Sequence, residues 1–247
     1  NWLRLSLKKS CRHADHIITD SEFSKKEIIK YLRVNAQKIT VVPCAVNHEE
    51  FHADYPTEQI QEVIRKYHIN EKYFLYLGTI EPRKNLERLI KAYAKLVNRH
   101  KDVPQLVLAG GKGWYYNDIF QMIDTGHLKE QVVFTGYVDQ KDSPLLMSGA
   151  IAFVFPSLYE GFGMPPLEAM ACGTPVITSK TSSLPEVVGD AGILVDPENV
   201  DEICEAMEKM MIEPAYRETL SLKGKKRADK FTWRKSAEQL MNVYQKL

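Results

Sequence analysis

The stretch YEGFGMPPLEAMACG, residues 159–173, follows an apolar run from Ala150 to Phe155. The run is typical of a buried strand, and the stretch itself predicts a loop followed by a short helix. Pro165 and Pro166 mark the start of this helix and Gly173 its end, because proline fits the first helical turn and glycine the position just past the last. A strand, a glycine-containing loop and a helix N-terminus together indicate an anion-binding site.

Two carboxylates flank this predicted anion site. Glu160 lies in the loop, and Glu168 lies on the first or second turn of the helix. They would repel a phosphate, so we expect them to accept hydrogen bonds from hydroxyl groups of the same ligand. A compound with hydroxyls on both sides of a diphosphate is a sugar nucleotide. The stretch therefore predicts a sugar-nucleotide site.

The alternation of strand and helix continues on both sides of this stretch. The apolar runs that we predict as strands are Tyr73–Leu77, Gln105–Ala109, Val132–Thr135, Ala150–Phe155, Val176–Thr178 and Ile193–Val195. Near-continuous apolar strands that alternate with helices indicate a parallel sheet covered on both faces. We therefore predict an α/β fold with a Rossmann-like parallel sheet.

Polar or glycine-rich loops directly follow five of these strands. They are Gly78–Asn85, Gly110–Trp114, Gly136–Asp139, the Glu160 loop and Ser179–Glu186. Open parallel sheets bind ligands outside the carboxyl ends of their strands, so these loops should surround one crevice. In the first loop, Arg83 and Lys84 come just before a helix that Asn85 is expected to cap, where cations would meet a diphosphate.

Other ligand fingerprints do not occur. The glycine-rich run is neither G-x-G-x-x-G nor a P-loop, and no D-x-D pair suggests a metal-held diphosphate. The segment HEEFH, residues 48–52, matches H-E-x-x-H, but it lies between Pro43 and Pro56 and no third ligand is evident. We expect a linker with surface histidines there and no metal site.

The amino-acid composition narrows the possible classes of protein further. The chain has 247 residues, 44% hydrophobic and 26% charged, which is ordinary for a globular protein. A net charge of +1 argues against nucleic acid as the main partner. Four cysteines without C-x-x-C spacing predict free thiols in a reducing compartment. The basic segment from Asn1 to His13 favours a solvated surface helix over an interfacial one, and the first residue, Asn1, suggests a piece of a longer protein.

Several ordered motifs carry a resemblance to a known family. They are GxxEPRKN at residues 78–85, GYV at 136–138, PSxYEGFG at 156–163 and EAMAxGxPV at 168–176. Together they closely resemble the retaining, GT-B-fold glycosyltransferases called glycosyl transferases group 1, in which Glu160 and Glu168 reproduce the E-x7-E spacing. The family has two nucleotide-binding-like domains with the active site in the cleft between them.

The resemblance implies a domain organisation. Residues 1–45 are expected to be the remnant of an N-terminal acceptor-binding domain that is otherwise missing. Residues 46–230 are expected to form the donor-binding domain, the C-terminal half of a GT-B fold. Residues 231–247, with Thr232 as a helix cap, are expected to form a helix that crosses back towards the N-terminal domain.

The resemblance also implies roles for individual residues. Lys84 and Arg83 would bind the donor diphosphate and ease its departure, with Gly78, Thr79, Gly110 and Gly111 around it. Backbone at Tyr137 and Val138 would meet the base, and Glu168 the ribose. Glu160 would meet the donor sugar, with N–H groups of Phe162, Gly163 and Met164 nearby. Many members have arginine where Thr79 stands, so Lys84 and Arg83 would carry more of the phosphate charge.

The expected activity is transfer of a hexose, with mannose as one candidate, from a nucleoside-diphosphate sugar to an acceptor. Transfer would retain configuration and need no metal or other cofactor, and this chain by itself is expected to bind donor without efficient transfer. A nucleotide-sugar epimerase of the same fold and a non-catalytic nucleotide-sugar-binding module are the alternatives. We expect a cytoplasmic location, with peripheral association at the inner face of the cell membrane as a further alternative.

Overall fold

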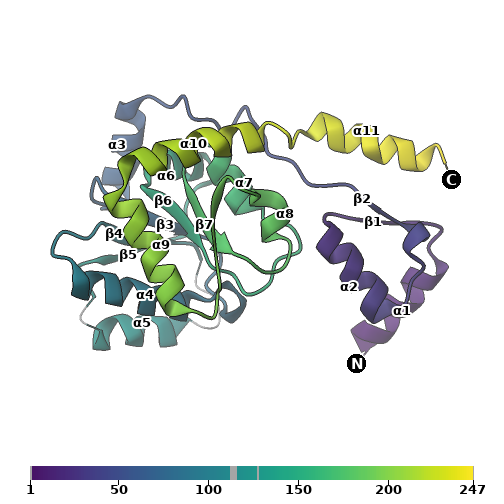
Figure 1. The fold of residues 1–247 in the computed structure, drawn as a ribbon, viewed down its shortest axis with the longest axis horizontal. Helices are drawn as coiled ribbons and strands as arrows, with labels where there is room; N and C mark the ends of the chain where they lie inside the picture. Colours follow the sequence, from purple (N-terminus) through teal and green to yellow (C-terminus); the bar gives the residue numbers. More distant parts are fainter. Residues whose placement is uncertain (1, 112–115, 127, 247) are drawn as a thin grey trace.

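A computed structural model describes residues 2–111, 116–126 and 128–246. The main body contains a parallel sheet of six strands in the order β5-β4-β3-β6-β7-β8, shown in Figure 1. The strands are β3 (Tyr73–Leu77), β4 (Gln105–Ala109), β5 (Val132–Gly136), β6 (Ala152–Phe155), β7 (Val176–Ser179) and β8 (Gly192–Val195). The predicted fold class and all six predicted strands are confirmed, with each strand end within two residues of the expected position.

Burial explains why the strands are almost entirely apolar. All residues of β6 and β7 are buried, and so are four of the five residues of β3. The sheet also buries two β3 tyrosines, whose hydroxyls need partners in an apolar surrounding. Tyr73 donates to the Leu146 carbonyl at 2.7 Å, and Tyr76 donates to the Thr79 carbonyl at 3.0 Å.

Helices cover both faces of the sheet. Helices α4 (Leu86–Arg99), α5 (Tyr116–Thr125) and α9 (Val200–Ile212) pack together on one side. The other side carries α3 (Thr57–Lys66), α6 (Ser143–Gly149), α7 (Met164–Ala171) and α10 (Pro214–Ala228), as Figure 1 shows, with the short α8 (Leu184–Val188) beside α7. The structure therefore has the layers of a doubly wound α/β fold.

The strand order fixes where a ligand crevice can form. From β3 the chain adds β4 and then β5 towards one edge, and it then returns to place β6 on the opposite side of β3. The crossovers that follow β3 and β6 consequently run towards opposite edges of the sheet. Such a reversal of strand order is where open α/β sheets bind their ligands.

The N-terminal segment forms a separate small sheet. It contains α1 (Trp2–His13), β1 (Ile17–Thr19), α2 (Glu22–Leu32), the 3-10 turn η1 (Ala36–Lys38) and β2 (Ile39–Val41). Strands β1 and β2 pair in parallel, and Leu32, Val34 and Ile39 form a small apolar cluster of their own. None of the helices in the described residues has the length and apolarity needed to cross a membrane.

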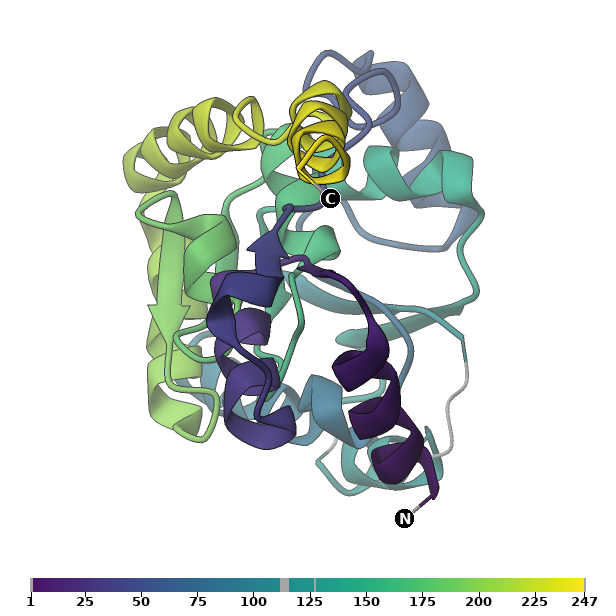
Figure 2. The same ribbon diagram turned by 90° about the vertical axis from the view of Figure 1, so that its right-hand side faces the viewer.

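The last helix returns to this N-terminal segment. Helix α11 (Trp233–Tyr244) begins after Thr232, whose hydroxyl accepts from the Lys235 N–H as expected of a cap. Ser236 Oγ donates to the Pro43 carbonyl at 2.7 Å, and Figures 1 and 2 show α11 lying beside the segment that contains β1 and β2. The domain boundaries at residues 45 and 230 stay predictions.

One helix start was wrongly predicted from the sequence, and one motif match lacks the local structure that the motif requires. The S-x-x-E pattern at Ser24 predicts a helix start there, but α2 begins at Glu22 and its cap is Ser21, whose hydroxyl accepts from the Ser24 N–H at 3.0 Å. Residues 48–50 form a turn, so the H-E-x-x-H segment lacks the helix that would align its histidines. Within the described residues, no group of three potential ligands could hold a metal ion.

We predict that Gly110→Ala destabilises the fold. Gly110 has φ of 152°, and a Cβ there would lie 2.0 Å from the Gly78 carbonyl oxygen. Clash and backbone strain together should lower the free energy of unfolding by about 2–5 kcal/mol in urea denaturation. Gly111→Ala is the matched control, because no described atom lies within 4 Å of its Cβ position. Equal stability of the two variants would contradict this close approach of the two loops.

Candidate functional site

Lys84 lies at the switch point between β3 and β6. The loop after β3 forms the 3-10 turn η2 (Pro82–Lys84), in which Lys84 is only 9% exposed. Its Nζ lies 4.7 Å from the centre of the Phe155 ring at the end of β6. It also donates to Glu160 Oε1 at 2.7 Å. The sheet therefore brings together a lysine and a glutamate that are 76 residues apart in the chain.

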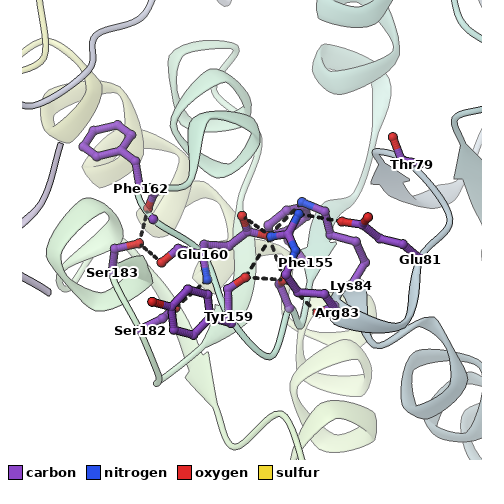
Figure 3. A network of polar contacts seen from close by, with 12 residues as sticks. Thr79, Glu81, Arg83, Lys84, Phe155, Tyr159, Glu160, Phe162, Ser182 and Ser183 are labelled. Carbon is purple, nitrogen blue, oxygen red and sulfur yellow. Dashed lines mark hydrogen bonds and ion pairs between the residues drawn. The ribbon is translucent and has the colours of Figure 1, made fainter. Parts of the chain in front are cut away.

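Arg83 contacts the same carboxylate from the solvent side. Its Nη1 lies 2.7 Å from Glu160 Oε2, and its Nη2 lies 2.5 Å from Glu81 Oε1. Nη1 also donates to the Tyr159 carbonyl at 2.8 Å. Figure 3 shows the Glu160 carboxylate in contact with both cations. We call Arg83, Lys84 and Glu160 the charge cluster.

The charge cluster keeps Glu160 ionised. Burial alone would raise the pKa of its carboxyl group, but hydrogen bonds from Lys84 and Ser157 and the charges of Lys84 and Arg83 outweigh burial. The pKa of Glu160 consequently lies below its ordinary value. The switch point thus holds two cations whose charge is partly neutralised by one protein carboxylate, an arrangement in which an incoming anion can compete with Glu160.

Serine hydroxyls fix the loop that carries Glu160. Ser157 Oγ lies 2.7 Å from Glu160 Oε1. From the loop after β7, Ser182 Oγ accepts from the Glu160 N–H at 3.2 Å, and Ser183 Oγ lies 2.8 Å from the Glu160 carbonyl oxygen. These serines were not among the predicted site residues. The sequence feature that could have identified these serines is their position in the loops directly after β6 and β7.

The start of α7 offers fewer N–H groups than an ordinary helix N-terminus. Gly163, with φ of 118°, is at the cap position and Met164 is the first helical residue, close to the expected start. Pro165 and Pro166 then follow, and proline has no N–H. Donors at this end of α7 are therefore limited to the backbone of Phe162, Gly163 and Met164, the three residues predicted from the sequence.

Glu168 lies in a different environment from Glu160. Burial, with a smaller contribution from the charge of Glu50, raises the pKa of Glu168 to about 7. Among the described residues, no hydrogen bond or ion pair joins Glu168 to the charge cluster. The nearby Glu50 comes from the H-E-x-x-H segment, and it is tied to the loop after β5 through Gln140 Nε2, 3.0 Å from Glu50 Oε1. Sequence reasoning had placed neither Glu50 nor Gln140 near the site.

Asn85 joins neighbouring loops and does not cap a helix through its side chain. It stands directly before α4 with φ of 62°, but its side chain accepts no bond from the helix backbone. Instead its amide donates to the carbonyls of Pro156 at 3.0 Å and Pro197 at 2.6 Å. Asn85 therefore occupies the expected N-cap position of α4, but its side chain ties the β3, β6 and β8 loops together instead of capping the helix.

The other predicted residues lie along the same sheet edge. The Gly110 N–H donates to the Gly136 carbonyl at 2.8 Å, which joins the loops after β4 and β5. Tyr137 is 76% exposed while Val138 is buried, and Thr79 lies apart from the charge cluster in Figure 3. Trp114, at the end of the expected Gly110–Trp114 loop, falls outside the described residues.

Three features now define the class of this protein: a doubly wound parallel sheet, a charge cluster at its switch point, and a last helix that returns to an N-terminal segment. They describe the C-terminal half of a GT-B fold. The chain belongs to the glycosyl transferases group 1 family, whose model matches residues 59–227. A second family model, Glycosyltransferase Family 4, matches residues 1–50.

Known proteins agree with this assignment. The chain is 37% identical over 247 residues to the O-antigen chain mannosyltransferase B of Escherichia coli, covering all of this chain and 64% of that protein. The structure of sucrose-phosphate synthase from Thermosynechococcus elongatus matches with a TM-score of 0.85 and 26% identity, over 98% of this chain and 61% of that one. Anabaena HepE, solved with UDP and glucose, has the same fold with a TM-score of 0.88 at 20% identity, over 99% and 67%.

Proposed function

We propose that this chain is the donor-binding part of a retaining hexosyltransferase that uses a nucleoside-diphosphate sugar. The observation that carries the proposal is the charge cluster at the switch point, where Lys84 and Arg83 offer two cations to an anion. The name of the E. coli relative makes mannose the first sugar to test. The UDP and glucose bound by HepE support a nucleotide sugar as the ligand class.

In the proposed reaction, the bond between the anomeric carbon and the diphosphate breaks while a bond to the acceptor oxygen forms. The acceptor proton passes to an oxygen of the leaving phosphate. Lys84 and Arg83 stabilise the negative charge that develops on the diphosphate, which is the main catalytic contribution of such a site. Glu160 binds sugar hydroxyls, Glu168 binds the ribose hydroxyls, and backbone at Tyr137 and Val138 meets the base.

The domain division expected from the sequence belongs to this proposal. Residues 46–230 would form the donor domain, and residues 1–45 would be the end of an acceptor domain. Because the chain spans 64% of the length of its E. coli relative, transfer is assigned to the longer protein. A cytoplasmic location, with the inner face of the membrane as the alternative, is likewise a proposal.

A transfer assay on the longer protein tests the activity. GDP-mannose, with UDP and ADP sugars in parallel, should yield free nucleoside diphosphate and a glycosylated acceptor with the donor configuration retained, in the presence of EDTA as well. Conversion of the donor to its epimer would favour the epimerase, and binding without turnover would favour a non-catalytic module. Loss of donor binding in EDTA would contradict a site that needs no metal.

Glu160→Gln is predicted to strengthen binding of a nucleoside diphosphate. The substitution removes the carboxylate that competes with the ligand for Lys84 and Arg83. The affinity for GDP should rise on the order of tenfold at low salt, because a like charge near the diphosphate is lost. The affinity for GDP-mannose should rise less, because the contact with the sugar is lost as well. Calorimetric titration measures both values.

Glu81→Gln is the control for this prediction. Glu81 also pairs with Arg83, but among the described residues its carboxylate makes no hydrogen bond or ion pair with Lys84. Its substitution should therefore change GDP affinity much less than Glu160→Gln. A loss of GDP affinity in Glu160→Gln would show that Glu160 supports diphosphate binding and does not compete with it.

A further inference from the structure

The N-terminal turn of α2 contacts the residue next to Glu160. Ser21 Oγ donates to the Gly161 carbonyl at 2.5 Å, and Ser24 Oγ donates to the same oxygen at 3.1 Å. Ser21 is buried to 2% exposure at this contact. The Phe23 ring meets the Tyr159 ring edge-on, with centroids 5.3 Å apart. Residues on both sides of Glu160 therefore touch one helix from the N-terminal segment.

A glutamate from the main body holds the same helix turn. The Glu186 carboxylate, on α8, accepts from the Glu22 N–H at 2.8 Å and from the Phe23 N–H at 2.7 Å. These two N–H groups belong to the first turn of α2, which has no helical partners for them, and the helix dipole favours a negative charge there. Each carboxylate oxygen of Glu186 thus accepts one hydrogen bond from the N-terminal turn of α2.

These contacts form a continuous path from Glu186 to the proposed sugar-binding carboxylate. The path runs from Glu186 to the first turn of α2, then through the hydroxyls of Ser21 and Ser24 to the Gly161 carbonyl. On its other side, the Glu160 loop is held by Ser182 and Ser183 from the main body. The position of one side of the Glu160 loop thus depends on contacts with the main body, and the position of the other side depends on contacts with α2.

We propose that Glu186 is a positioning residue, which holds α2 against the Glu160 loop and so sets the position of Glu160 towards the donor sugar. We call the contacts of Glu186 and Gly161 with α2 the latch. Docking of the N-terminal segment then orders the sugar end of the site more than the diphosphate end at Lys84, which the η2 turn and the Phe155 ring also hold in place. The functional half of this inference rests on the proposed function, whereas the structural coupling does not.

Hydrogen exchange of the 247-residue chain tests the coupling without any ligand. Glu186→Ala and, separately, Ser24→Ala should speed amide exchange in residues 159–163 as well as at the start of α2. Ser24→Ala leaves the capping hydroxyl of Ser21 in place. Glu205→Gln, an exposed carboxylate on α9, is the control and should leave both segments at the wild-type rate. Faster exchange at the start of α2 alone would overturn the latch.

Paired titrations with GDP and GDP-mannose test the functional half. Glu186→Ala should weaken GDP-mannose binding about two- to tenfold, the effect of one hydrogen bond, and leave GDP binding within about twofold. The double variant with Ser24→Ala should lose less than the sum of the single losses, because both act through one path. Equal loss for both compounds would overturn the positioning role. A wild-type chain that binds neither compound would count against the proposed function, while the exchange measurement still decides the coupling.

Discussion

Lys84→Ala is expected to weaken binding of a nucleoside diphosphate by about 1.5–3 kcal/mol, roughly ten- to hundredfold, which is the range for a hydrogen bond to a charged group. The buried ammonium group loses little of its charge interaction to solvent, and the Phe155 ring and Glu160 hold it in place. Transfer by the longer protein should fall further, because charge on the leaving diphosphate grows in the transition state. Calorimetric titration gives the first value and initial-rate kinetics the second.

Lys91→Ala is the matched control for this variant. Lys91 lies on α4, and its ammonium group pairs with Glu87 one turn away, with half of its side chain exposed. Its loss should change nucleoside-diphosphate affinity by less than about 0.5 kcal/mol. An affinity of Lys84→Ala equal to that of the wild type, in a variant with an unchanged melting curve, would assign Lys84 a purely structural role.

Glu168→Gln should remove a pH dependence from both binding and stability. With a pKa of about 7, Glu168 of the free protein changes from neutral to ionised between about pH 6 and pH 8. The ionised carboxylate accepts hydrogen bonds from ribose hydroxyls more strongly, so wild-type affinity for GDP should rise through this range and then level off. The Gln variant should show a flat profile over the same range and an affinity about 1–2 kcal/mol below that of the wild type at pH 8.

The stability of the wild type should fall as the pH rises through this range, whereas its affinity for GDP should rise. Its folded-state pKa, about 7, lies above the ordinary value of 4.5, so the folded chain binds the proton more tightly than the unfolded chain. The contribution of Glu168 to stability is complete below pH 4.5 and is lost as the pH rises through 7. Glu168→Gln should therefore be more stable than the wild type at pH 8 by on the order of 3 kcal/mol, with the difference vanishing as the pH falls below about 4.5.

Glu50→Gln tests why the pKa of Glu168 is raised. Glu50 raises the pKa of Glu168 through its charge, although less than burial does. Glu50→Gln should consequently move the midpoint of the binding profile to lower pH while keeping its shape. A midpoint that moves to higher pH, or a Glu168→Gln variant that keeps the wild-type profile, would place the titrating group elsewhere.

The sheet could be predicted from the sequence because each strand is a short, almost wholly apolar run, a pattern that burial on both faces imposes. The proximity of Lys84 and Glu160 followed from the same regularity, since both lie just beyond the carboxyl ends of parallel strands. Local caps were harder to predict. Ser21 and Ser24 are both good caps, and only the backbone conformation decides between them.

Contacts between loops that are distant in the chain could not be predicted from the sequence. The Asn85 amide donates to the Pro156 and Pro197 carbonyls, which belong to loops far from it in the chain, and these contacts satisfy buried carbonyl groups. Glu186 and α2 are likewise 163 residues apart, and neither segment has a feature that marks the other as its partner. The raised pKa of Glu168 depends on burial by the whole fold, and no motif records that burial.

We propose that the switch point between β3 and β6 binds the diphosphate of a sugar donor through Lys84. The decisive experiment is calorimetric titration of the 247-residue chain with GDP, UDP and ADP, repeated with Lys84→Ala. We predict that at least one nucleoside diphosphate binds the wild type at a single site and binds the variant roughly ten- to hundredfold more weakly. Absence of binding to all three by a demonstrably folded wild-type sample would contradict the claim.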